Sequence, residues 1–396
     1  MRLRQLDILR AGAILLVLGA HAPPGIRELP EPTSSLFKMW QKGGWSGVDL
    51  FFVLSGFLVS GLLFREYKSS GRIDPTRFLV RRGFKIYPPF YTLFILTLTV
   101  RWLTSEPTGI WAGLAEGVFL QNYHVGLWGY TWTLAVEEHF YLIIGIGLAT
   151  LVRYYPEKPF RPLVVAFVVV PFVVLGLRIL TAVTLPFQHK THHWPTHLRI
   201  DSLLFGTMLA YVHCFRPEVF ARLVRWRWPI LLVSLGCLIP PWVLPASDVF
   251  MHTIGYSLLA LGFGGLLVFS LGQPQAKSWV AGALVTLLML VGTHSYSIYL
   301  WHGPMAGWVM PLLRTWINLG DGFLFNLILY MLGACVLGIV MAKLVEFPFL
   351  HLRDRYFPAR SRTSGLPATE QEKARPLLSG EMETTFGSLS CAPISK

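Results

Sequence analysis

The most regular feature of the sequence is a succession of apolar stretches, each about twenty residues long and separated from the next by a polar connection. A stretch of that length forms a helix that can cross a hydrocarbon core about 30 Å thick. We therefore predict an all-α, polytopic transmembrane helical bundle of about ten spans. The spans are placed at 7–24, 45–64, 84–103, 130–151, 162–184, 197–214, 229–246, 251–271, 294–312 and 323–345.

Two further apolar stretches are too short to cross a bilayer comfortably. Residues 109–120 and 279–292 each fit an interfacial or re-entrant helix better than a full span. The second stretch could also be a span, which would make eleven.

Lysine and arginine alternate between rich and poor connections along the chain. Cytoplasmic connections carry the excess of these residues, so the alternation predicts that both termini are cytoplasmic. The rich connections hold Arg65, Lys68, Arg72, Arg77, Arg81, Arg82, Lys85, Arg153, Lys158, Arg161, Arg216, Arg222, Arg225, Arg227 and Lys277, and the poor ones hold Arg27, Lys38, Lys42, Arg101, Lys190 and Arg314.

The composition supports a membrane protein. Of 396 residues, 53% are hydrophobic and only 14% are charged, which is unsuited to a soluble domain with a polar surface. The formal net charge of +13 is explained by orientation and contact with membrane lipid, so we expect no nucleic-acid partner.

The two ends of the chain raise separate questions. The first residues resemble a secretory signal, but Pro23 and Pro24 would hinder cleavage after Ala22, so we expect His21 to be retained. We assign residues 1–350 to a transmembrane domain and 351–396 to a cytoplasmic tail, disordered from about residue 357 because its composition is polar. The four cysteines form no paired or metal-binding pattern.

Charged residues inside the first three spans are the first candidates for function, because burying them in a membrane is costly. Arg10 and His21 are eleven residues apart, so they point from one helix face about 16 Å apart. Asp49 lies near the outer start of the second span, in a segment whose small residues suit close helix packing. Arg82 and Lys85, one turn apart at the cytoplasmic entrance of the third span, resemble an anion site.

The fourth span contains two adjacent glutamates, which point in directions about 100° apart. Glu137 shares its face with Thr133 and Tyr141, whereas Glu138 lies over Leu134. Further polar residues enter the sixth and ninth spans, namely Arg199, Asp201, Tyr296, Tyr299 and His302.

With these residues in place, the sequence resembles the membrane-bound acyltransferase 3 family over most of residues 1–350. Arg10 and His21 match the family's pattern of a basic residue, ten intervening residues and a histidine. The blocks GVDLFFVLSGFL, RRGFKIYPPFY, WTLAVEEHFY, RIDSLLFG, SYSIYLWH and VEFPF follow in the family's order. One departure is Lys85, which stands where relatives usually have a second arginine and cannot make the forked contact of arginine.

The resemblance implies O-acylation, usually with acetyl from acetyl-CoA, of a carbohydrate or glycoconjugate hydroxyl at a bacterial inner membrane. Histidine suits general-base catalysis near neutral pH, so His21 is the candidate base, with Glu137 as the carboxylate that orients it. Acyl-CoA would be a co-substrate, with its phosphates near Arg82 and Lys85 and with Arg10 deeper along the path, and no cofactor would be bound permanently. The candidates for binding the acceptor or orienting the base are Asp49, Trp132, Glu138, Tyr141, Arg199, Asp201 and His302.

Other interpretations of the same residues remain open. Intramembrane polar residues also bridge helices, and the basic residues of the third span also contact anionic lipid. We expect no metal centre at Glu137, Glu138 and His139, and we favour a solvated acceptor-side loop over a metal site for His189, His192, His193 and His197. A multispan transporter of a sugar or acylated metabolite is the main functional alternative, and a partner without activity of its own is the third.

Overall fold

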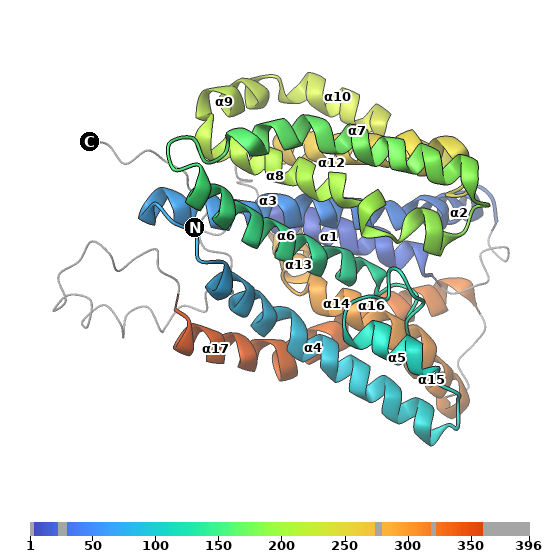
Figure 1. Cartoon of the computed structure of the whole chain (residues 1–396). Helices are drawn as coiled ribbons and strands as arrows, with labels where there is room; N and C mark the ends of the chain where they lie inside the picture. The colour runs from blue at the N-terminus through green and yellow to red at the C-terminus, as the bar shows by residue number, and fades with distance from the viewer. Residues whose placement is uncertain (1–3, 23–29, 274–278, 318–321, 359–396) are drawn as a thin grey trace.

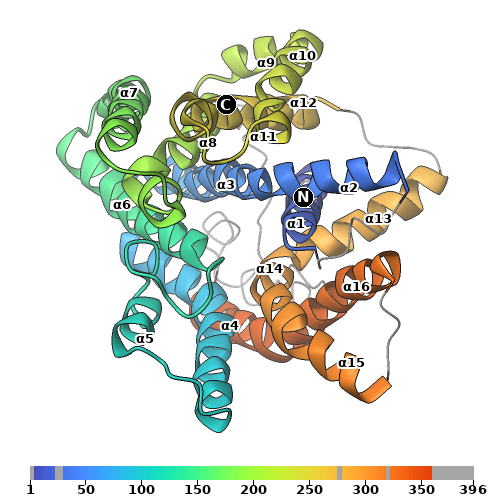
Figure 2. The same cartoon turned by 90° about the vertical axis from the view of Figure 1, so that its right-hand side faces the viewer.

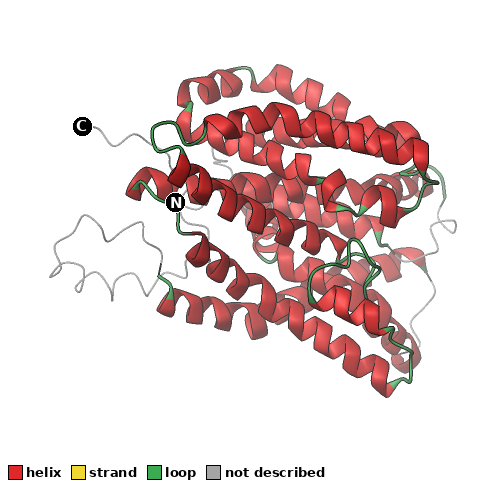
Figure 3. Cartoon of the chain, in the orientation of Figure 1, coloured by secondary structure: helices red, strands yellow, loops and turns green. Residues whose placement is uncertain are grey.

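The computed structural model describes residues 4–22, 30–273, 279–317 and 322–358, and within these ranges every regular element is a helix (Figure 3). The expected tail from about residue 357 therefore lies almost wholly outside the described residues, as do Arg27 and Lys277. The first half of the chain forms α1 (Arg4–Ala20), α2 (Thr33–Gly43), η2 (Gly44–Ser46), α3 (Gly47–Ser70), α4 (Pro75–Leu103), α5 (Ile110–Gly117), α6 (Trp132–Tyr154), α7 (Arg161–Thr184), η3 (His189–His193) and η4 (Thr196–Leu198). The second half forms α8 (Ile200–Phe215), α9 (Pro217–Arg225), α10 (Arg227–Cys237), α11 (Pro240–Val243), η5 (Met251–Gly255), α12 (Tyr256–Leu271), α13 (Trp279–Thr293), α14 (Ser295–Pro304), η6 (Met305–Val309), α15 (Met310–Ile317), α16 (Phe323–Met341), η7 (Ala342–Glu346) and α17 (Phe347–Tyr356).

The helices form one bundle whose elements run roughly across the view of Figure 1. Helices α9 and α17 lie toward its left side, and α2, α5 and α15 lie toward its right. Viewed from the end, α1 and α3 lie in the middle, with α6 and α7 on one side, α9, α10 and α12 on a second, and α4, α14 and α16 on a third (Figure 2). The middle helices therefore meet neighbours from most of the chain.

Five continuous helical segments are long and apolar enough to cross a membrane, or up to seven if each of two bent helix pairs is one span. One bent pair joins α9 to α10–α11 at 76°, and the other joins α13 to α14–α15 at 67°. The stretch 279–292 thus forms the first arm of a bent pair. The all-helical, membrane-spanning class is confirmed, whereas the count of ten spans and the cytoplasmic termini stay predictions.

Helices α3 and α8 lie in direct backbone contact. A Cβ atom on Gly56 would collide with the carbonyl oxygen of Leu203, and one on Gly206 would collide with that of Val53. Glycine allows this approach because it carries no side chain. The expectation of close packing along the second span is confirmed at Gly56, and the close contact fixes α3 beside α8.

Helix α4 starts nine residues earlier than the predicted third span. Asp74 caps it by accepting a hydrogen bond from the backbone N–H of Arg77 at 3.0 Å, and Pro75 occupies its first turn. Arg82 and Lys85 therefore lie inside a helix of 29 residues, about two turns from its start, where their side chains can face a neighbouring helix.

Candidate active site

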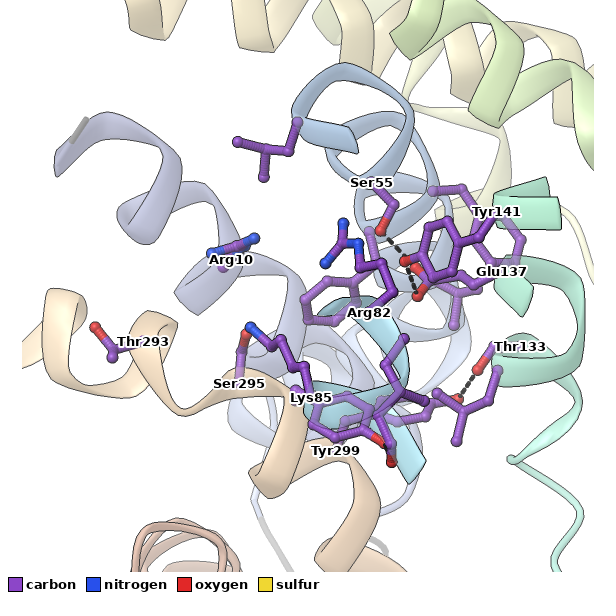
Figure 4. Close-up of a pocket in the computed structure, with 17 residues that line it drawn as sticks. Arg10, Ser55, Arg82, Lys85, Thr133, Glu137, Tyr141, Thr293, Ser295 and Tyr299 are labelled. Atoms are coloured by element: carbon purple, nitrogen blue, oxygen red, sulfur yellow. Dashed lines mark hydrogen bonds between the residues drawn. The ribbon is translucent and has the colours of Figure 1, made fainter. Parts of the chain in front are cut away.

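A polar cavity opens between helices α1, α3, α4, α6 and α14 and the end of α13. The space between its lining atoms is about 770 Å³, including its open mouth. Its polar lining consists of Arg10, Ser55, Arg82, Lys85, Thr133, Glu137, Tyr141, Thr293, Ser295, Tyr296 and Tyr299 (Figure 4). The predicted anion-binding residues, Arg10, Arg82 and Lys85, thus line one space.

Neighbouring groups hold each of the three cations. Arg10 lies 3.6 Å from the carboxylate of Asp7, one turn earlier on α1. Lys85 lies 3.9 Å from Glu346, which also accepts a hydrogen bond of 2.7 Å from Ser297.

The third cation, Arg82, stacks its guanidinium over the ring of Tyr141, 4.8 Å from the ring centre. The cavity thus gathers three cations from α1 and α4, a grouping that suits a polyanionic ligand such as one with several phosphates.

Glu137 is the carboxylate of this cavity. It accepts hydrogen bonds from Ser55 at 2.6 Å and from Tyr141 at 2.8 Å. Thr133, Glu137 and Tyr141 all line the cavity, so the predicted polar face of α6 is confirmed. Glu138 points elsewhere and accepts a hydrogen bond of 3.0 Å from Tyr87.

His21 lies one residue beyond the end of α1. Its Nδ1 is 2.9 Å from the carbonyl oxygen of Val17, and its ring meets the ring of His302 with centres 4.9 Å apart. His21 is not among the residues described as lining the cavity. Because Glu137 bonds to Ser55 and Tyr141 instead, the structure places it in the cavity and not at hydrogen-bonding distance from His21.

Tyr299 connects the cavity to the two histidines. It lines the cavity, its hydroxyl bonds to the carbonyl oxygen of Tyr130 at 2.6 Å, and Thr133 lies 2.7 Å from that hydroxyl. Its own carbonyl oxygen accepts a hydrogen bond from Nδ1 of His302. One residue of α14 thus borders the cavity on one side and positions the neighbour of His21 on the other.

Four of the predicted acceptor residues lie in a separate, closed cluster. Asp49 pairs with Arg199 at 2.7 Å, and Asp201 pairs with Arg178 at 2.6 Å. Trp132 packs beside this cluster, with Arg199 5.8 Å from its ring centre.

The lining of the cavity includes none of the side chains of this cluster, namely Asp49, Trp132, Arg178, Arg199 and Asp201. Asp49 and Arg199 contact each other, Asp201 contacts Arg178, and Trp132 packs beside them, so that their role toward the acceptor stays a prediction.

The histidine-rich connection before α8 is less solvated than expected. His192 and His193 are buried, and Nδ1 of His193 lies 2.7 Å from the Tyr256 hydroxyl. Burial, the charge of Arg199 and the nearby His189 lower the pKa of His193 well below its usual value. This part of the connection packs against Trp132 and Tyr256 beside the closed cluster.

The sequence analysis did not identify several residues of the cavity and of the closed cluster. Ser55 belonged only to the GVDLFFVLSGFL block, and Glu346 only to the VEFPF block. Their roles depend on which helix lies opposite, which the sequence does not contain. Arg178 did carry a signal, because it is a lone charge in the most apolar predicted span, and such a charge needs a buried partner.

The fold and cavity define a multi-pass helical membrane protein with a polar, cation-rich site inside its bundle. A family model described as an acyltransferase domain, that of acyltransferase family 3, matches residues 3–345. The chain therefore belongs to the acyltransferase 3 family.

Curated relatives include the O-acetyltransferase OatA of Staphylococcus aureus strain MRSA252. It is 23% identical over 394 residues, which cover 94% of this chain and 60% of the relative. The same protein of strain NCTC 8325 / PS 47 matches with the same identity and coverage. This chain thus spans about 60% of the length of these relatives. No solved structure matches the chain.

Proposed function

We propose that this protein is an integral-membrane O-acyltransferase that moves an acetyl group from cytoplasmic acetyl-CoA to a hydroxyl of a carbohydrate or glycoconjugate at a bacterial inner membrane. The observation that carries the proposal is that helix α1 bears Arg10, which lines the cation-rich cavity, and leads directly into His21, which has the chemistry of a general base. Family membership and the O-acetyltransferase relatives support the reaction class.

The donor side of the proposal rests on charge. Acetyl-CoA carries several phosphate charges, and Arg10, Arg82 and Lys85 supply three cations around one space. Arginine binds phosphate through its planar fork, whereas lysine acts as a point charge, so Arg82 is expected to contribute more than Lys85. We assign phosphate binding to Arg82 and Lys85, with Arg10 closer to the thioester.

The assignment of His21 as the base for the acceptor hydroxyl rests on which of its two ring nitrogens carries a proton. A carbonyl oxygen can only accept a hydrogen bond, so the contact with Val17 assigns the proton of the neutral ring to Nδ1. Nε2 then carries the lone pair and can take the proton of the acceptor hydroxyl. The hydroxyl oxygen attacks the thioester carbonyl carbon, the carbon–sulfur bond breaks, and the proton passes from His21 to the departing sulfur.

The remaining assignments follow from this reaction. Tyr141 and Glu138 stay candidates for acceptor contacts, and Glu137 organises the cavity through Ser55 and Tyr141. A cytoplasmic donor and an acceptor from the other side fit a chain with cytoplasmic termini, a transmembrane domain over 1–350 and a tail over 351–396.

Acetyl transfer by the purified full chain in lipid nanodiscs tests the proposal. The chain is given acetyl-CoA labelled in its acetyl group and a panel of carbohydrate acceptors that includes octyl β-glucoside. We expect label on an acceptor with the unchanged chain, and at least a ~100-fold loss with His21→Ala.

The matched control is His351→Ala, since His351 is exposed on α17. This variant should retain the activity. Label that stays on CoA throughout contradicts the enzyme and is expected of a transporter, and full turnover by His21→Ala removes His21 as the base.

A further inference from the structure

The ring nitrogen Nε2 of His302 is an unexplained polar atom. His302 is only 1% exposed, and Nε2 has no hydrogen-bond partner among the described residues. A buried polar atom without a partner costs free energy, so its position calls for an explanation. The ring of His302 lies against the ring of His21, with ring centres 4.9 Å apart and planes at 66°.

The hydrogen bonds of the two rings assign their protons. Nδ1 of His21 faces the carbonyl oxygen of Val17, and Nδ1 of His302 faces that of Tyr299. Because both partners can only accept, each neutral ring carries its proton on Nδ1 and a lone pair on Nε2. Two lone pairs cannot bond to each other, whereas one added proton can be shared between them as an N–H···N hydrogen bond.

We propose that His302 is a positioning residue that accepts a hydrogen bond from His21 when His21 carries the proton of the acceptor hydroxyl. This inference rests on the proposed function and adds a residue to its mechanism. The described hydrogen-bond partner of each ring is a backbone carbonyl at Nδ1, so His302 would accept from the protonated Nε2 of His21, whereas the carboxylate of a hydrolase triad accepts from Nδ1.

The surroundings favour this assignment. Tyr130 packs its ring 4.4 Å from that of His302, and Tyr299 packs at 5.5 Å, so the pair is shielded on the His302 side. A hydrogen bond to a charged group is stronger where water is excluded.

The proton balance of the reaction is unchanged. His21 takes the proton from the hydroxyl and returns it to the sulfur of CoA, while the new oxygen–carbon bond replaces the carbon–sulfur bond. His302 accepts the hydrogen bond during this interval and neither gains nor loses a proton over the cycle.

Two variants at one position separate this function from a structural one. Asparagine places its amide N–H where Nδ1 was, so His302→Asn keeps the bond to Tyr299 but loses the acceptor at Nε2. Glutamine reaches farther and places an amide oxygen near the position of Nε2, so His302→Gln keeps an acceptor toward His21. Both are compared with the unchanged chain and with His21→Ala in nanodiscs, with labelled acetyl-CoA and octyl β-glucoside.

We expect His302→Asn to lower kcat about 10- to 100-fold with the KM for acetyl-CoA unchanged. Because His21 then loses the acceptor that favours its protonated form, the acidic limb of the pH profile of kcat should move to lower pH. His302→Gln should restore at least about a third of the kcat of the unchanged chain, as expected for an acceptor retained near its original position. Thermal unfolding of each variant shows that the chains compared are folded.

The opposite ranking, or equal losses in both variants, overturns the proposal, because a purely structural His302 depends on the bond to Tyr299. Full kcat in His302→Asn also overturns it while His21→Ala remains inactive, and the proposed function then stands. If the unchanged chain transfers no label, or His21→Ala keeps its turnover, the proposed function itself fails.

Discussion

The cavity and the closed cluster are built from the same kinds of residue and behave differently. In the closed cluster, Arg199 and Asp49 are fully buried and pair at 2.7 Å. In the cavity, the side chain of Lys85 keeps 15% of its surface exposed and lies 3.9 Å from Glu346. The first arrangement pairs its charges closely away from the cavity, and the second places its charges around a space that a ligand can enter.

This difference teaches how to distinguish structural from functional charges in a membrane bundle. Both clusters satisfy the rule that intramembrane charges need partners or a cavity, so the presence of a charge does not decide between them. The two clusters differ in the distance between opposite charges: Arg199 and Asp49 pair at 2.7 Å, whereas Lys85 and Glu346 lie 3.9 Å apart. In this chain α3 takes part in both, through Asp49 in the closed cluster and Ser55 in the cavity.

The largest effect is expected on the free energy of unfolding, when an ion pair of the closed cluster is removed. Asp49→Ala leaves the charge of Arg199 buried without its carboxylate, and such a loss costs about 3–5 kcal/mol of the free energy of unfolding. Denaturation of the purified protein in detergent measures it.

The control for this change removes both charges together. Asp49→Leu with Arg199→Met should recover most of the loss, because an apolar pair of similar size leaves no buried charge. An Asp49→Ala chain as stable as the original would show that the cluster does not support the fold.

The second largest effect is expected on the KM for acetyl-CoA, from a change in the cavity. Arg82→Gln should raise the KM for acetyl-CoA about 10- to 100-fold, since a charge-assisted contact to phosphate contributes roughly 1.5–3 kcal/mol, while the free energy of unfolding changes little. Initial rates at varied acetyl-CoA concentration measure it.

Arg81→Gln is the matched control, because the neighbouring Arg81 bonds to Asp354 on α17 and does not line the cavity. An equal rise of KM in both variants would place the donor site outside the cavity.

A smaller effect on stability comes from pH, through His193 beside the closed cluster. The pKa of His193 is lowered in the folded chain, so the unfolded chain binds this proton first as the pH falls. The free energy of unfolding should therefore fall below about pH 6.5, by at most about 1.4 kcal/mol per pH unit from this group.

His193→Asn tests this contribution, because asparagine keeps an acceptor for the Tyr256 hydroxyl and does not titrate. The stability difference between pH 7 and pH 5.5 should shrink in this variant. An unchanged difference would assign the acid sensitivity to other groups.

The smallest effect is expected at the position that departs from the family. Lys85→Arg introduces the forked contact with phosphate, and the KM for acetyl-CoA should fall about two- to fivefold at equal kcat. A rise of KM would indicate that Lys85 is fitted to Glu346 and not to the ligand.

The sequence predicted the helical membrane class and the polar face of α6, because both follow from periodicity along one chain segment. It also grouped Arg10, Arg82 and Lys85 correctly as one set, with the help of the family resemblance. It did not predict the pairing of Asp49 with Arg199 or of Asp201 with Arg178, because the partner of a charge lies on another helix and only packing decides which. The contact of His302 with His21 joins residues 281 positions apart and could not be derived from local pattern.

The close contact of α3 and α8 has a consequence for how the protein accommodates its ligand. With Gly56 and Gly206 touching the opposite backbone, these two helices cannot slide or rotate past one another without a steric clash. Helices α3 and α8 therefore form a rigid pair, which fixes the positions of Ser55 and Asp49 on α3. Widening of the cavity is therefore expected from its other helices, among them α4, which contains Pro88 and Pro89 and so lacks two of its internal hydrogen bonds.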